Sequence, residues 1–173
     1  MMPYMAVQVL NVSSSGTGIL LTAAGCGAVI PTVMFARAGI KNRRMGICIG
    51  SFMAGFAIIG FAFTSYQFQS FSLALVFVFI IGLSSSIYML SAISSIQLNV
   101  PHEFRGRIMG IYTITYSIVS LGGLYSGLVG GYVDRLLDIE HIGVPLSIGL
   151  GGVIVIIGSV FLYLYNKSLK TEA

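Results

Sequence analysis

Five long apolar runs, joined by short polar links, make up most of this chain. None of the runs contains Asp, Glu, Lys, Arg or His, and they cover residues 18–36, 45–64, 71–96, 108–133 and 144–165. A helix that crosses a bilayer needs about 20 mostly apolar residues, so each run is long enough. The pattern predicts an all-α, polytopic membrane bundle with five spans within residues 1–173.

Composition supports a membrane protein. Only 8% of the residues are charged, whereas a soluble domain typically carries about a quarter. The chain also has 22 glycines, which suits membrane helices that pack closely through their backbones. The net charge of +4 is spread over separate short links, so we do not expect a nucleic-acid partner and expect membrane lipid instead.

The basic residues alternate between links in a way that predicts orientation. Eight of the nine fall on one side of a five-helix zigzag, and they are Arg37, Lys41, Arg43, Arg44, Arg105, Arg107, Lys167 and Lys170. The links at residues 65–70 and 134–143 carry a single basic residue, Arg135. Because Lys and Arg collect in short cytoplasmic loops, we expect a multi-pass protein of the cell membrane with its C-terminus in the cytoplasm.

This orientation places the start of the first span outside. Residues 1–12 resemble the last turns of a further apolar helix rather than a signal peptide, because they lack a basic segment and a full apolar segment. We therefore expect the C-terminal part of a longer membrane protein. A five-span protein with a translocated N-terminus is the alternative.

Small and polar residues recur at helical spacing within the spans. Glycines four residues apart predict faces for helix packing, and they are Gly46 and Gly50 in one span and Gly123, Gly127 and Gly131 in another. Polar side chains predict a second kind of face on each of two spans, formed by Ser84, Tyr88, Ser91 and Ser95 in the third span and by Tyr112 and Tyr116 in the fourth. These side chains could line a substrate cavity, or they could bond to their own helix or to a neighbouring one.

The residues indicate no enzyme. There is no Ser, His and Asp set, no phosphate-binding glycine loop and no cluster of metal ligands, so we expect no cofactor and no metal. Cys26 and Cys48 both fall within apolar runs, where cysteine usually acts as a small apolar residue. The spans also lack the Asp or Glu that usually marks a proton relay.

The link between the third and fourth spans carries a more specific pattern, QLNVPHEFRGRIMGIY. It resembles the link between the tenth and eleventh helices of major facilitator superfamily transporters, above all the drug and siderophore exporter branch. The residues that match are Gln97, Val100, Pro101, Arg105, Gly106, Arg107 and Met109. The first link resembles a degenerate copy of the superfamily's basic loop, in which Arg37, Gly39 and Lys41 fit. Ala36 stands in place of the aspartate and Thr32 in place of the first glycine.

The resemblance implies the end of helix seven and helices eight to twelve of a twelve-helix fold. It implies an exporter of small hydrophobic or amphipathic compounds that works by alternating access and is coupled to protons. Its partners would be a small-molecule substrate and the N-terminal six-helix half. The cytoplasmic gate would include Arg37, Gly39, Lys41, Arg43, Arg44, Pro101, Arg105, Gly106 and Arg107.

Other functions stay open at this point. A nutrient importer of the same superfamily would share these features. A non-transporting membrane module, or a nonfunctional truncated product, would share the spans but not the transport. For the two arginines around Gly106, the simpler alternative is that they only anchor the topology.

Overall fold

A computed structural model describes residues 5, 10, 14–39, 42–137 and 143–171, with backbone alone at residues 14, 115–120, 136–137 and 165–171. Five long helices account for most of them: α2 (Ser14–Ala38), α3 (Arg43–Gln67), α4 (Phe71–Asn99), α5 (Arg105–Leu137) and α6 (Gly143–Thr171). A short 3-10 helix, η2 (His102–Phe104), joins α4 to α5. No strand occurs in the described residues, so the predicted all-α class is confirmed.

Four of these helices are long and apolar enough to cross a membrane, namely α2, α3, α4 and α6. They indicate a membrane-embedded protein. The fourth predicted span, residues 108–133, is helical within α5. The side chains of residues 115–120 lie outside the described residues, so the described part of α5 does not test whether this helix crosses the membrane. The fourth span therefore stays a prediction.

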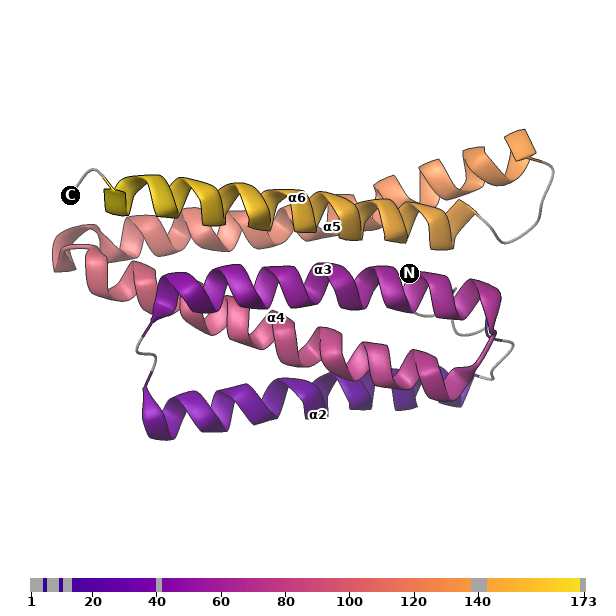
Figure 1. The fold of residues 1–173 in the computed structure, drawn as a ribbon, viewed down its shortest axis with the longest axis horizontal. Helices are drawn as coiled ribbons and strands as arrows, with labels where there is room; N and C mark the ends of the chain where they lie inside the picture. The colour runs from indigo at the N-terminus through magenta and orange to yellow at the C-terminus, as the bar shows by residue number, and fades with distance from the viewer. Residues whose placement is uncertain (1–4, 6–9, 11–13, 40–41, 138–142, 172–173) are drawn as a thin grey trace.

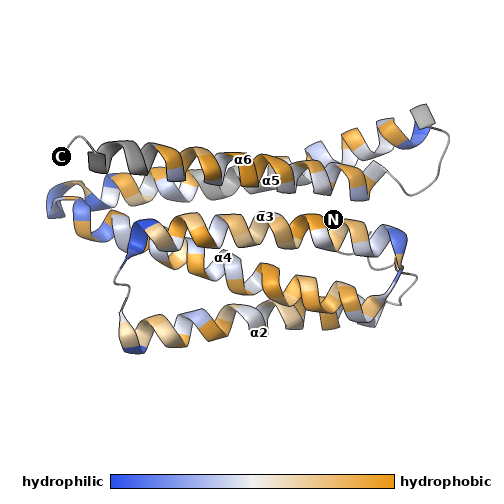
Figure 2. Cartoon of the chain, in the orientation of Figure 1, coloured by the Kyte–Doolittle hydropathy of each residue, from blue (hydrophilic) through white to orange (hydrophobic). Residues whose placement is uncertain are grey.

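The helices run alternately up and down, and this zigzag brings the ends of distant segments together (Figure 1). The last residues of α2 and α4 lie at the same end as the first residues of α3 and α5. Apolar residues fill the middle of the helices, and hydrophilic residues lie at the opposite ends of α3 and α5 and also at this end (Figure 2). We call it the basic end, because it carries Arg37, Arg43, Arg44, Arg105 and Arg107.

The helices pack side by side in a row rather than in a closed ring. Helix α4 packs against both α2 and α3, α3 also packs against α6, and α6 packs against α5. Helix α5 makes few contacts with α4, so it is held mainly by α6. Figure 1 shows the α5–α6 pair as one layer beside α2, α3 and α4.

Backbone rules explain two of the helix ends at the basic end. Helix α2 stops at Gly39, which has a φ of +66° and donates its N–H to the Phe35 carbonyl at 3.0 Å. Such a left-handed cap favours glycine. Helix α4 stops before Val100, which is extended because the residue before a proline disfavours helical geometry. Pro101 therefore ends the helix.

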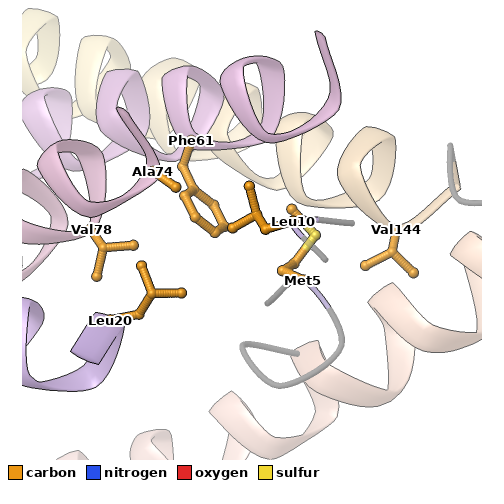
Figure 3. Packing of buried hydrophobic residues seen from close by; sticks show 7 residues of the cluster. All are labelled: Met5, Leu10, Leu20, Phe61, Ala74, Val78 and Val144. Carbon is orange, nitrogen blue, oxygen red and sulfur yellow. The ribbon is translucent and has the colours of Figure 1, made fainter. Parts of the chain in front are cut away.

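A buried apolar cluster joins the helices at the end opposite the arginines. Its members are Met5, Leu10, Leu20, Phe61, Ala74, Val78 and Val144 (Figure 3). Met5 and Leu10 precede α2, and the Leu10 N–H donates to the Met5 carbonyl at 2.9 Å. The rest of the helix end expected over residues 1–12 lies outside the described residues.

Candidate functional site

Five arginines from three helix ends define the basic end. Arg37 lies in the last turn of α2, Arg43 and Arg44 begin α3, and Arg105 and Arg107 begin α5. The first link of the sequence and the link between α4 and α5, which are about 60 residues apart in the chain, are thus brought to one surface. Lys41 lies outside the described residues.

The charge at this surface is unbalanced. Among the residues that the structure describes, Glu103 is the one carboxylate at the basic end, because Asp134 lies at the far end of α5. Asp134 there accepts a hydrogen bond from the Gly143 N–H at 2.6 Å, at the start of α6. The Nε atoms of Arg43 and Arg105 are buried and have no hydrogen-bond partner within the described chain. An arginine-rich surface with so few acids is suited to binding anions.

The link from α4 to α5 is compact. Pro101 precedes η2, which ends at Phe104, and Arg105 starts α5 directly afterwards. Arg105 is half-buried and Arg107 is exposed. A Cβ built on Gly106 would meet no described atom within 4 Å, so no other described segment packs closely against this glycine.

Helices α3 and α4 meet through the predicted small residues. A side chain on Gly46 would collide with the Ser91 hydroxyl, and one on Gly50 would lie 2.7 Å from the Tyr88 backbone nitrogen. Gly46 and Gly50 therefore pack as the sequence predicted. Ser84 and Ser91 are fully buried in this interface, and the Ser84 hydroxyl donates to the Ile80 carbonyl at 2.6 Å. Of the two alternatives for these serines, the structure therefore shows helix packing rather than the lining of a cavity.

The remaining described residues of the two predicted polar faces are at least partly exposed. Tyr88 is 42% exposed, while Ser95 and Tyr112 are half-buried on different helices. The Ser95 carbonyl accepts the Asn99 side-chain amide at 2.9 Å. The side chain of Tyr116 lies outside the described part of the chain. The sequence pattern found a polar face, but α3 covers part of it.

The glycine stripe of α5 is not covered by another helix of the described chain. A Cβ added to Gly123 or Gly131 would meet no described atom within 4 Å, and Gly127 is exposed. Helix α5 instead meets α6 through Gly130, which approaches Gly143 and Val144. The hydroxyls of Ser126 and Ser147 are 2.8 Å apart in the same interface. The described chain therefore does not use Gly123, Gly127 and Gly131 for helix packing, because α6 covers the adjacent face.

Several closely packed glycines were missed by the sequence reasoning. Gly82 lies against the Ala24 carbonyl and Gly27 against the Phe79 carbonyl, where α2 crosses α4. Gly55 and Gly152 face each other where α3 crosses α6, and Ser159 of α6 donates to the Cys48 carbonyl at 2.9 Å. These glycines do not form four-residue repeats within one helix. These contacts could have been predicted by looking for pairs of glycines that lie on different helices at the same depth in the membrane.

Cavities with mostly apolar walls open between the helices of the described chain. One of about 400 Å³ lies at the basic end and is lined by Phe35, Ala38, Gly39, Asn42, Met45, Gly46, Ile49 and Ile87. Two others, of about 470 and 230 Å³, lie between α3 and α6. Walls of this kind suit hydrocarbon rather than a polar substrate.

Neither metal-binding side chains nor similarity to known proteins assigns a function to this surface. In the part of the chain that is described, no three His, Cys, Asp or Glu side chains lie close enough to hold a metal ion. No protein-family model, curated protein or solved structure matches this chain.

Ser91 provides a direct test of the interface. Its hydroxyl is buried and has no hydrogen-bond partner among the described residues, and leaving such a group unsatisfied costs about 1–3 kcal/mol. We expect Ser91→Ala to leave the free energy of unfolding unchanged or to raise it, measured by thermal unfolding in detergent. Ser84→Ala, which removes a bonded hydroxyl, is the matched control and is expected to be neutral or mildly destabilising. A marked loss of stability in Ser91→Ala would contradict this placement.

Proposed function

We propose that this chain is part of a secondary active transporter of the major facilitator superfamily, and that it exports small hydrophobic or amphipathic compounds by alternating access. The observation that carries the proposal is the link between α4 and α5. Its residues Gln97, Val100, Pro101, Arg105 and Arg107 resemble the exporter pattern. They lie between two long helices at the end where the other arginines gather.

The open face of α5 also supports the proposal. Large side chains such as Leu124, Leu128 and Tyr132 are exposed there, beside the uncovered glycines Gly123 and Gly131. A smooth face of small residues lets another helix approach closely. In the proposed transporter this face meets helices of the N-terminal half, and the substrate lies between the two halves near the middle of the membrane.

The proposed mechanism assigns the arginines to the cytoplasmic gate. Arg105 and Arg107 would reach acidic groups or helix carbonyls of the other half when the inner side is closed, and would release them when it opens. Proton coupling is part of the proposal, and the carboxylates that carry the proton would belong to the other half, since the spans here hold none.

Efflux of a dye tests this function. We expect cells that express this chain together with its proposed N-terminal half to hold less ethidium than cells that express either part alone. A protonophore should abolish the difference, because coupling depends on the proton gradient. Equal dye content in all these cells would count against an exporter, and protonophore-sensitive accumulation of a labelled nutrient would favour the importer.

A further inference from the structure

The cavity at the basic end has no role in the proposed transport mechanism, and its walls come from three helices. Helices α2 and α3 both pack against α4, so they form two walls with α4 beneath them. Phe35 and Ala38 stand on one wall, Met45 and Ile49 on the other, and Ile87 of α4 lies between. Gly39 and Asn42 line the cavity at the helix ends that carry Arg37 and Arg43.

The depth of this cavity matches the upper part of a lipid acyl chain. Met45 and Ile49 lie two and six residues after the start of α3, which corresponds to roughly 3–9 Å along a helix axis. Both side chains are exposed. An apolar cavity just below a charged helix end would sit directly beneath the headgroups of one leaflet.

Charge identifies the kind of headgroup. Arg37 directly precedes Ala38 in the chain at the end of one wall, and Arg43 directly follows Asn42 at the start of the other. The Nε of Arg43 is buried and has no described partner. The Asn42 side chain does not cap the first turn of α3. The N–H groups at the start of a helix carry a partial positive charge, which adds to the charge of the arginines. Basic pockets between membrane helices select anionic lipid headgroups.

We propose that this cavity binds one phospholipid with an anionic headgroup, with an acyl chain between α2 and α3 and the phosphate at Arg37 and Arg43. The inference needs only that the helices lie in a membrane, so it stands or falls separately from the transport proposal.

The chain has no tryptophan, so a single introduced indole can report which lipid lies next to it. The full chain is reconstituted in phosphatidylcholine vesicles that contain either brominated phosphatidylglycerol or brominated phosphatidylcholine, and quenching of the indole is measured. Reporters Phe35→Trp and Ile49→Trp stand on opposite walls of the cavity. Phe63→Trp stands in the groove between α3 and α6 at the other end and serves as the control.

We expect both cavity reporters to show binding of phosphatidylglycerol about fivefold or more tighter than phosphatidylcholine, since each surface arginine contributes roughly that factor. The control reporter should show no preference. The double substitution Arg37→Gln with Arg43→Gln should remove the preference, whereas Arg135→Gln at the opposite end should not.

A cavity-filling variant separates a bound lipid from general enrichment near positive charge. Ala38→Phe fills the cavity and keeps every arginine, and Ala36→Phe adds the same bulk on α2 outside the lining residues. We expect Ala38→Phe to lower the preference at Ile49→Trp and Ala36→Phe to leave it. The proposal is overturned if all three reporters show the same preference, or if the preference survives Ala38→Phe.

Discussion

Gly82→Leu is expected to separate α2 from α4 and to cause the largest loss of stability of any single change considered for this chain. A side chain at residue 82 would collide with the Ala24 carbonyl, which is backbone and cannot turn away. Overpacking of a close contact typically costs about 1–3 kcal/mol, and a collision with backbone should lie at the upper end of that range or above. Thermal unfolding of the purified chain in detergent measures the effect.

Gly25→Leu is the matched control for that change. Gly25 lies on α2 two residues from the close contact at Gly27, yet no described atom outside its own turn of helix lies within 4 Å of its Cβ position. The same substitution there should leave the free energy of unfolding unchanged or raise it slightly. Leucine stabilises a helix relative to glycine by up to about 1 kcal/mol. Equal losses of stability at residues 25 and 82 would show that α2 does not cross α4 as described.

The second large effect is expected for the double substitution Arg105→Gln with Arg107→Gln in the dye-efflux assay. If these arginines hold the inner side closed, each lost charge-assisted hydrogen bond removes about 1.5–3 kcal/mol from that state. A change of about 1.4 kcal/mol is tenfold in an equilibrium constant, so transport should fall roughly tenfold or more. The amount of inserted protein should not change, because Arg37, Arg43 and Arg44 still mark the same side.

The control for this pair is Arg135→Gln, which removes an exposed arginine at the opposite end of α5. It should insert and transport as the unsubstituted protein does. Normal insertion with normal efflux in the double variant would leave Arg105 and Arg107 with an anchoring role alone. Lost insertion would also point to anchoring, because the protein would be missing from the membrane rather than present and unable to close.

The glycines show most clearly where prediction from the sequence stopped. Gly46 and Gly50 were found because they repeat every four residues along one helix, and they do pack against α4. Gly123, Gly127 and Gly131 show the same repeat, but α6 lies against the neighbouring face that contains Ser126 and Gly130. A repeat within one helix shows that a smooth face exists and does not show whether another helix covers it.

The polar residues of α4 show a related limit. Spacing placed Ser84, Tyr88 and Ser91 on one face, but it left open whether that face meets a cavity or a helix. Helix α3 covers Ser84 and Ser91 completely, while Tyr88 stays exposed. Because a hydroxyl in a membrane helix can bond to its own preceding turn, as Ser84 does, a polar face alone does not indicate a substrate path.

The sequence by itself determined the long apolar helices and the alternation that gathers the arginines at one end, and local backbone rules account for the helix ends at Gly39 and Pro101. These features follow from local chemistry: apolar length, backbone geometry at glycine and proline, and the order of charges along the chain. Only the tertiary structure decided which helices touch, which glycines are buried and where the apolar cavity at the basic end opens. In lipid, apolar side chains favour every neighbour almost equally, so the choice of neighbour depends on shape matched between two distant segments.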